Sequence, residues 1–67
     1  MNFAKAREAA GLSMAESARR LGVTTSAVSQ WESGLTFPDA RRLSEIAAVY
    51  GCTVDELLRE EAADAVH

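Results

Sequence analysis

The sequence predicts an all-α fold built from five short helices. Apolar residues recur three and four positions apart, which is the spacing of one face of an α-helix. A glycine follows each of the first four apolar stretches, and Asn, Ser, Thr or Asp stands before every stretch, as expected at helix ends and helix starts. No segment shows the alternation of a strand. The expected helices cover about residues 3–10, 14–21, 25–32 and 40–50, and a short fifth helix begins after Thr53.

The size and composition restrict the class of protein. The 67 residues make one small domain, with room for a core of about a dozen side chains. No apolar run reaches the roughly 20 residues of a membrane span, and no signal peptide is visible. The single cysteine, Cys52, excludes an intramolecular disulfide, and the single histidine, His67, leaves no metal-ligand spacing. We therefore expect a cytoplasmic protein without a metal or cofactor.

The net charge of −3 at first disfavours a nucleic-acid partner, because phosphate repels acidic proteins. The distribution of charge matters more. Residues 1–34 carry four basic and three acidic side chains, a balance of +1, whereas residues 35–67 carry three basic and seven acidic ones, a balance of −4. The acidic excess thus lies in the second half of the chain, where solubility is its simplest explanation.

The stretch from Ser13 to Glu32 predicts two short helices joined by a tight turn. Ser13, with Glu16 three residues later, has the pattern of a capping box, in which each side chain bonds to the other residue's backbone N–H. Gly22 tolerates a positive φ between two apolar anchors, as a sharp turn requires. Thr24 can cap the following helix. Two helices held at a fixed angle in this way form a helix-turn-helix.

The second helix of this pair has an unusual outward face. Val28 and Trp31 anchor its inner face, and the outer positions carry short polar side chains. These outer residues are Thr25, Ser26, Ser29 and Gln30. An ordinary solvated face would more often carry Lys and Glu, whereas hydroxyl and amide groups are suited to base edges in the major groove. The pattern favours base reading over a simple solvated surface.

The remaining apolar positions define an expected core. Asn2, Asp39 and Thr53 are expected to cap the first, fourth and fifth helices, the last with Glu56 as a second capping box. Ser17 lies near the inner stripe of its helix, where a larger apolar residue would be expected. The expected inward residues are Phe3, Ala6, Ala10, Leu12, Ala15, Ala18, Leu21, Val28, Trp31, Leu43, Ile46, Ala47, Tyr50, Val54, Leu57 and Leu58.

Taken in order, these signals resemble the Xre/Cro family of helix-turn-helix regulators, also called lambda-repressor-like domains. The matching text is AREAAGLSMAESARRLGVTTSAVSQWESG, then a loop with Pro38, then LSEIAAVYGCTVDELL, about residues 3–58 in all. GLS before the second helix, LGV in the turn, the W-E-x-G ending and the closing G-x-T-x-D-E-L-L recur together in that family. The resemblance implies a compact five-helix domain whose third helix enters the DNA major groove.

The resemblance also assigns roles to single residues. The four outward residues of the third helix match the family's base-reading positions. Thr24 matches a phosphate contact at the positive end of that helix. Arg7 and Glu32 match an ion pair that joins the first and third helices, so their role is structural.

Two features depart from the family pattern. Met14 stands where the family typically has a phosphate-contacting Gln, and a thioether cannot donate a hydrogen bond. Leu35 and Phe37 occupy a loop that usually carries Lys or Arg. Either Phe37 folds inward, where Ala6 and Ser17 replace larger family residues, or the two form an exposed apolar patch that marks a protein interface.

The phosphate contacts would then depend on other basic residues. Arg41 and Arg42 stand at the start of the fourth helix, and Lys5 and Arg19 are further candidates. The sequence leaves open whether Arg41 and Arg42 bind phosphate or are ordinary surface charges.

The leading hypothesis is a sequence-specific regulator that binds double-stranded DNA as a homodimer on a palindromic operator. One reader helix covers only a few base pairs, and a dimer doubles both the site and the phosphate contacts. The expected dimer interface is Leu58, Ala62 and Val66. Residues 1–59 would form the DNA-binding domain, and residues 60–67 an acidic tail or an extension of the fifth helix. No small-molecule ligand is expected.

Two alternatives belong to other classes. A protein-interaction module, such as an antitoxin or anti-repressor partner, is suggested by the acidic balance, Met14 and the Leu35–Phe37 loop. An enzyme is disfavoured, and no catalytic residue is predicted. Cys52 is better explained as a small buried hydrophobe than as a nucleophile, and the acidic pairs at 55–56 and 60–61 as helix-terminal or solvated charge.

Overall fold

The computed structural model describes residues 1–59, which form five α-helices and no strand. The helices are α1 (Phe3–Ala9), α2 (Met14–Leu21), α3 (Thr25–Ser33), α4 (Ala40–Tyr50) and α5 (Val54–Leu58). The all-α prediction is confirmed, as are the predicted bounds of α2 and α4, while α1 and α3 each differ by one residue at the C-terminal end. None of these helices has the length and apolar character needed to cross a membrane.

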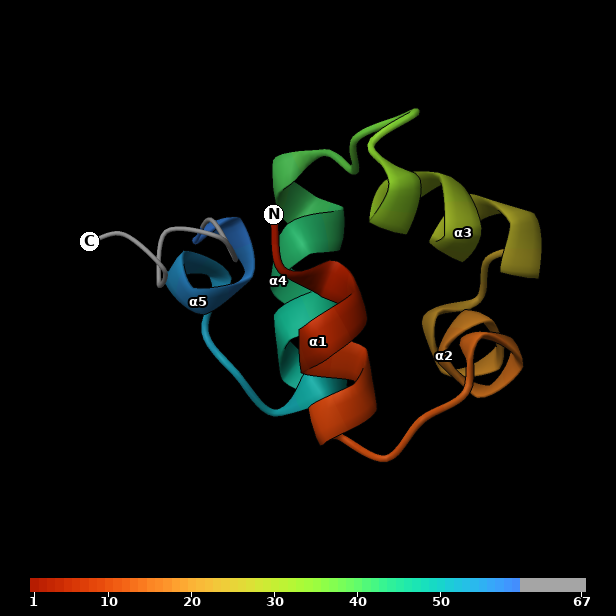
Figure 1. Cartoon of the computed structure of the whole chain (residues 1–67), viewed down its shortest axis with the longest axis horizontal. Helices are drawn as coiled ribbons and strands as arrows, with labels where there is room; N and C mark the ends of the chain where they lie inside the picture. Colours follow the sequence, from red (N-terminus) through yellow and green to blue (C-terminus); the bar gives the residue numbers. More distant parts are fainter. Residues whose placement is uncertain (60–67) are drawn as a thin grey trace.

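The helices pack around α4. This helix contacts α1, α2 and α5, while α3 packs against α2 and α1. Figure 1 shows α2 and α3 on one side of α4 and α5 on the other side. The helix-turn-helix segment is therefore supported from behind by α1 and α4.

Local capping explains where most of the helices begin. The Ser13 hydroxyl accepts a hydrogen bond from the Glu16 N–H at 3.0 Å, and the Glu16 carboxylate accepts one from the Ser13 N–H at 3.3 Å. An equivalent capping box opens α5 at Thr53. Asp39 caps α4 through the Arg42 N–H at 2.8 Å. These three predicted caps are confirmed.

The predicted cap at Asn2 is wrong. Its backbone, with φ −122° and ψ 31°, lacks the extended conformation of the other caps, and its side chain makes no capping hydrogen bond. The Asn2 N–H instead donates to the Leu57 carbonyl at 2.9 Å, which ties the start of α1 to α5. The Asn2 Oδ1 atom is left buried without a hydrogen-bond partner.

The core follows the predicted apolar stripes with three exceptions. The buried apolar residues are Phe3, Leu12, Ala18, Leu21, Val28, Trp31, Leu43, Ile46, Ala47, Tyr50 and Leu57. Ala10, Ala15 and Leu58 are exposed, so their predicted inward positions are wrong. Ala10 lies beyond the end of α1, and Leu58 is turned away because its neighbour Leu57 occupies the inner face.

Ala15 is exposed because of the rotation of α2 about its own axis, which decides the residues that face the core. The inner stripe is Met14, Ser17, Ala18 and Leu21, which have the spacing of one helical face, so Ala15 falls outside it. Ser17 is fully buried, and its Oγ lies beside the Tyr50 hydroxyl without the geometry of a full hydrogen bond. Burial raises the pKa of the Tyr50 phenol, and the nearby Ser17 hydroxyl opposes that shift.

Candidate nucleic-acid interface

The turn between α2 and α3 is built as the sequence predicts. Gly22 ends α2 in the left-handed conformation, with φ 72°, which favours a residue without a side chain. The Val23 N–H donates to the Ala18 carbonyl at 3.0 Å and closes the turn. Thr24 is extended, and its hydroxyl accepts a hydrogen bond from the Ala27 N–H at 3.0 Å. The turn and the cap together fix the direction in which α3 leaves α2.

The two faces of α3 differ sharply in exposure. Val28 and Trp31 are buried against the rest of the domain. Thr25, Ser26 and Ser29 are exposed on the outer side. Gln30 is half-buried because its side chain leans toward the following loop, where its Oε1 accepts from the Thr36 hydroxyl at 3.5 Å. The outer face of α3 therefore offers hydroxyl and amide groups without a charged side chain among them.

An ion pair holds α3 from behind. Arg7 Nε lies 2.6 Å from Glu32 Oε2, and Arg7 Nη2 lies 3.2 Å from Glu32 Oε1. The Nη1 atom donates to the Leu12 carbonyl at 2.8 Å. Only 11% of the Arg7 side chain and 8% of the Glu32 side chain are exposed. The hydrogen bond to Glu32 raises the pKa of Arg7, although burial opposes the shift, so the guanidinium remains charged.

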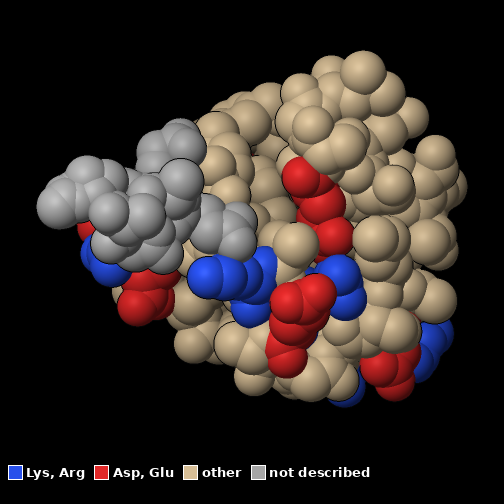
Figure 2. Space-filling view, viewed as in Figure 1, with Lys and Arg blue, Asp and Glu red and all other residues tan. Residues whose placement is uncertain are grey.

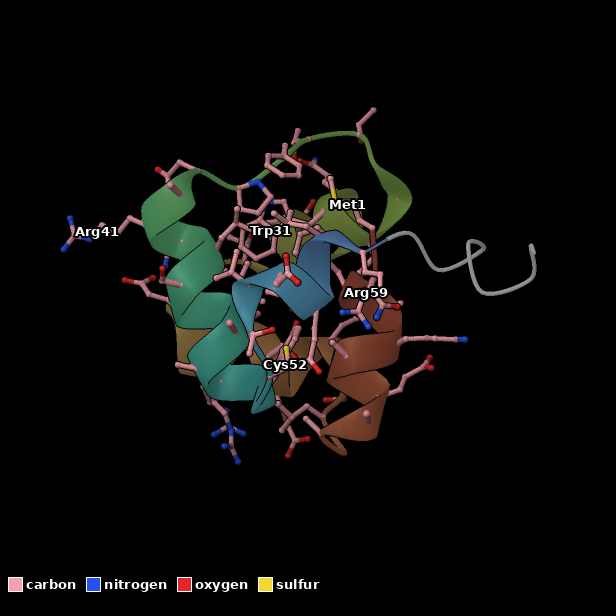
Figure 3. All side chains as sticks on the ribbon, turned by 90° about the vertical axis from the view of Figure 1, so that its left-hand side faces the viewer. Met1, Trp31, Arg41, Cys52 and Arg59 are labelled. Atoms are coloured by element: carbon pink, nitrogen blue, oxygen red, sulfur yellow. The ribbon has the colours of Figure 1, made fainter. Side chains whose placement is uncertain are left out.

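The two arginines at the start of α4 have different environments. Figure 3 shows Arg41 extending away from the first turn of α4, and this residue is exposed. Arg42 turns back onto the protein, where its Nη1 donates to the Leu21 carbonyl at 2.9 Å and to Glu45 Oε1 at 2.8 Å. The structure therefore leaves Arg41 open to solvent and engages Arg42 with α2.

The other basic candidates lie elsewhere on the surface. Arg19 is exposed on α2, with its guanidinium 3.8 Å from the Glu16 carboxylate. Lys5 lies on α1 beside a hollow that is also lined by Cys52 and Arg59. Lys5 is therefore placed toward α5, and the structure does not bring it together with the outer face of α3.

The surface over α3 is poor in positive charge. Neither α3 nor residues 34–39 contain a Lys or an Arg. Figure 2 shows the surface over α3 and the following loop without blue side chains, whereas the charged groups gather over the lower part of this face. Contacts from α3 to a ligand would therefore depend on neutral hydrogen bonds and on the helix N-terminus.

The structure answers the question left open for the α3–α4 loop. Leu35 is 73% exposed and Phe37 is 55% exposed. The Phe37 ring does contact the core at its edge, because it meets the Phe3 ring at a centroid distance of 6.4 Å and an interplanar angle of 66°. Met14 packs against the core, half-buried. Phe37 therefore does not fold fully inward, and both loop residues are exposed apolar side chains.

The remaining candidate residues concern a metal site, a nucleophile and a dimer interface. Within residues 1–59, no group of three or more His, Cys, Asp or Glu side chains is placed to hold a metal ion. Cys52 is half-buried, and burial raises the pKa of its thiol, which makes it a poor nucleophile. Leu58 is 39% exposed on α5. Ala62, Val66 and His67, with the rest of the predicted tail, lie outside the described residues.

Comparison with known proteins agrees with this geometry. Residues 3–57 match the family model described as helix-turn-helix. No curated protein and no solved structure matches the chain. The family match covers most of the chain, and the arrangement of α1 to α5 is that of a lambda-repressor-like domain. The chain therefore belongs to the Xre/Cro-like helix-turn-helix family of DNA-binding regulators.

Proposed function

We propose that this protein is a sequence-specific transcriptional regulator that binds a palindromic operator as a homodimer, with α3 in the major groove. The observation that carries the proposal is the contrast between the two faces of α3. Its inner face is fixed by the core and by the Arg7–Glu32 pair, while its outer face presents neutral hydrogen-bonding groups. A rigid helix with an adaptable polar face is what direct base readout requires.

The proposed reading positions are the first two turns of α3. Thr25, Ser26 and Ser29 are exposed there, and Gln30 offers a carboxamide that can bond to adenine in the bidentate manner. Thr24 stands at the N-terminus of α3, where its N–H and the positive end of the helix dipole would meet a phosphate. A good bidentate contact, such as one from Gln30 to adenine, is worth about 1–3 kcal/mol in discrimination against a wrong base, whereas the phosphate contact at Thr24 would position the helix without reading sequence.

The small number of basic side chains placed to contact phosphate beside α3 supports the dimer. Arg41 and Arg19 are exposed basic residues on the helices next to α3. Each neutralised phosphate contributes a slope of about −0.9 to the dependence of log affinity on log salt concentration, so one domain would show a shallow slope and weak affinity. A second copy doubles these contacts. Leu58 is exposed at the proposed interface, which continues through Ala62 and Val66 outside the described residues.

Selection of bound oligonucleotides from a random pool tests this function. We expect enrichment of a palindrome whose half-sites are about 10 base pairs apart, or a multiple of that distance. Sedimentation at the working concentration should show a dimer. A pool without enrichment after several rounds would refute sequence-specific binding, and a purely monomeric sedimentation profile would refute the dimer alone.

A second candidate function is supported by the apolar loop. Leu35 and Phe37 are exposed where a DNA-binding surface would gain from cations, and such a patch is suited to a protein partner. The protein would then act as an antitoxin or anti-repressor partner. Anisotropy measurements with random DNA at low salt distinguish the two functions. The complete absence of even non-specific binding would favour the interaction module.

A further inference from the structure

Arg42 makes a contact that links the fourth helix to the helix-turn-helix. Its Nη1 atom lies 2.9 Å from the Leu21 carbonyl oxygen and 2.8 Å from Glu45 Oε1, and both contacts have hydrogen-bond geometry. Leu21 is the last residue of α2, directly before Gly22. The bond therefore connects two helices at the point where the chain turns toward α3.

The chemistry of the helix end explains why a cation is stabilising there. The last carbonyls of a helix have no partner within the helix, and they form the negative end of the helix dipole. The Gly22 and Val23 N–H groups bond to the Ala18 and Arg19 carbonyls. The guanidinium of Arg42 supplies a charged donor for the Leu21 carbonyl, which is a stronger interaction than a bond between neutral groups.

Both the backbone and the guanidinium of Arg42 are held by further hydrogen bonds. Its backbone N–H is capped by the Asp39 carboxylate at 2.8 Å, and its guanidinium is oriented by Glu45 one turn later. The neighbouring residue, Arg41, extends from the same turn into solvent. The Arg42–Leu21 bond therefore lies between the exposed Arg41 and the turn that leads to Thr24.

We infer that Arg42 is a positioning residue and not a phosphate ligand. It holds the start of α3 at a fixed distance from Arg41. The base-reading residues of α3 and the phosphate contact of Arg41 can then reach the same DNA duplex together. This inference rests on the proposed function, because the groups that it positions are the proposed DNA contacts.

A matched pair of substitutions tests the role. Arg42→Gln and Arg41→Gln remove the same charge from adjacent residues of one helix. Because the proposed dimer carries two copies of Arg41, we expect Arg41→Gln to lower the salt slope by about 1.8, which is about 12-fold in the ratio of affinities at about 50 and 200 mM salt. Arg42→Gln should leave that ratio unchanged. It should instead lower the discrimination between the selected site and its single-base variants by about 5-fold, at a temperature where circular dichroism shows both variants folded.

Either of two results would overturn the inference. If Arg42→Gln lowers the salt slope as Arg41→Gln does, Arg42 is a phosphate ligand. If it changes neither the slope nor the discrimination, the bond has no positioning role. Should Arg42→Gln fail to fold, Glu45→Ala removes the acceptor that orients the guanidinium and should lower discrimination in the same direction, with the slope again unchanged.

A measurement without DNA separates this inference from the proposed function. In amide NMR spectra, Arg42→Gln should shift the Gly22 and Val23 signals, which lie next to the Leu21 carbonyl, while Arg41→Gln should leave them in place. If the wild type binds no DNA, the proposed function fails. Unmoved turn signals in Arg42→Gln would then refute the bond itself, and shifted signals would uphold the link between α4 and the turn.

Discussion

Replacing Arg7 by Met is expected to remove a large part of the stability of this domain. The substitution keeps a long side chain but deletes both hydrogen bonds to Glu32 and the bond to the Leu12 carbonyl. Glu32 would then remain as a charge with 8% of its side chain exposed and no cation beside it. Such an unpaired buried charge is far more costly than the loss of a surface ion pair.

The magnitude follows from the burial of the pair. Removing one partner of a buried ion pair costs about 3–5 kcal/mol. About a tenth of the Arg7 side chain is exposed, which places the expected loss near the lower limit, about 3 kcal/mol. At 67 residues the free energy of unfolding should be roughly 3–10 kcal/mol. Arg7→Met therefore removes a third or more of it, or unfolds the domain entirely.

Urea unfolding followed by circular dichroism measures this loss. If the free energy of unfolding decreases by about 1 kcal/mol for each 1 M of urea, the urea concentration at the unfolding midpoint should fall by about 3 M. Arg19→Met is the matched control, because its ion pair with Glu16 lies at the surface, and it should cost under about 1 kcal/mol. The double variant Arg7→Met/Glu32→Leu should be at least about 2 kcal/mol more stable than the sum of the single losses implies.

Equal losses for Arg7→Met and Arg19→Met would refute the reasoning, because burial would then have no effect on the value of the pair. Additive losses in the double variant would refute the direct coupling of Arg7 and Glu32. If the loss of stability in Arg7→Met disappears in about 1 M salt, the assignment of a buried ion pair would also be contradicted, since salt screens a buried pair only weakly.

Three further predictions concern the recognition face, the loop and the thiol. Gln30→Ala should relax base preference at one operator position by about 5-fold or more, with a nearly unchanged melting temperature, and a repeated selection that returns the same site would contradict its reading role. Phe37→Ser should cost about 1 kcal/mol in urea unfolding because the edge contact with Phe3 is lost, whereas a fully free ring would cost nothing. Cys52 should react with iodoacetamide more slowly in the native protein than in urea at about pH 8, because burial raises its thiol pKa and leaves less thiolate. The native rate should increase as the pH rises, and equal rates in the two states would contradict this.

Much of the fold can be predicted from the sequence because its signals are local. The capping boxes at Ser13 and Thr53 join residues three positions apart, and both occur in the structure. The turn at Gly22 needs a left-handed residue, and only the glycine in that stretch adopts it readily. Helix bounds depend on such short-range signals, which is why the predicted bounds of α2 and α4 are correct.

The sequence-based predictions of the fold are wrong mainly where contacts between residues far apart in the chain determine the conformation. Ala15 is apolar, but Met14 and Leu21 set the phase of α2 and place Ser17 inside, beside Tyr50 from α4. Asn2 has the composition of a cap, but the Leu57 carbonyl holds its backbone in another conformation. The contact of Asn2 with Leu57 leaves no local signal, whereas the spacing of Met14, Ser17, Ala18 and Leu21 is a local one that the apolar character of Ala15 obscures.

The same division applies to the candidate site. The outer face of α3 follows from helical periodicity alone. The different environments of Arg41 and Arg42 do not, because the Leu21 carbonyl is 21 residues away from Arg42 along the chain. Two adjacent arginines have the same propensity, and only the packing of α4 against α2 distinguishes them.

The claim that α3 is the DNA-binding helix is tested most directly by amide NMR spectra during titration with the selected operator. The largest shifts are expected from Thr24 to Gln30, with a second group around Arg41. Shifts confined to α1 and α5, or spectra that do not change at low salt, would contradict the claim.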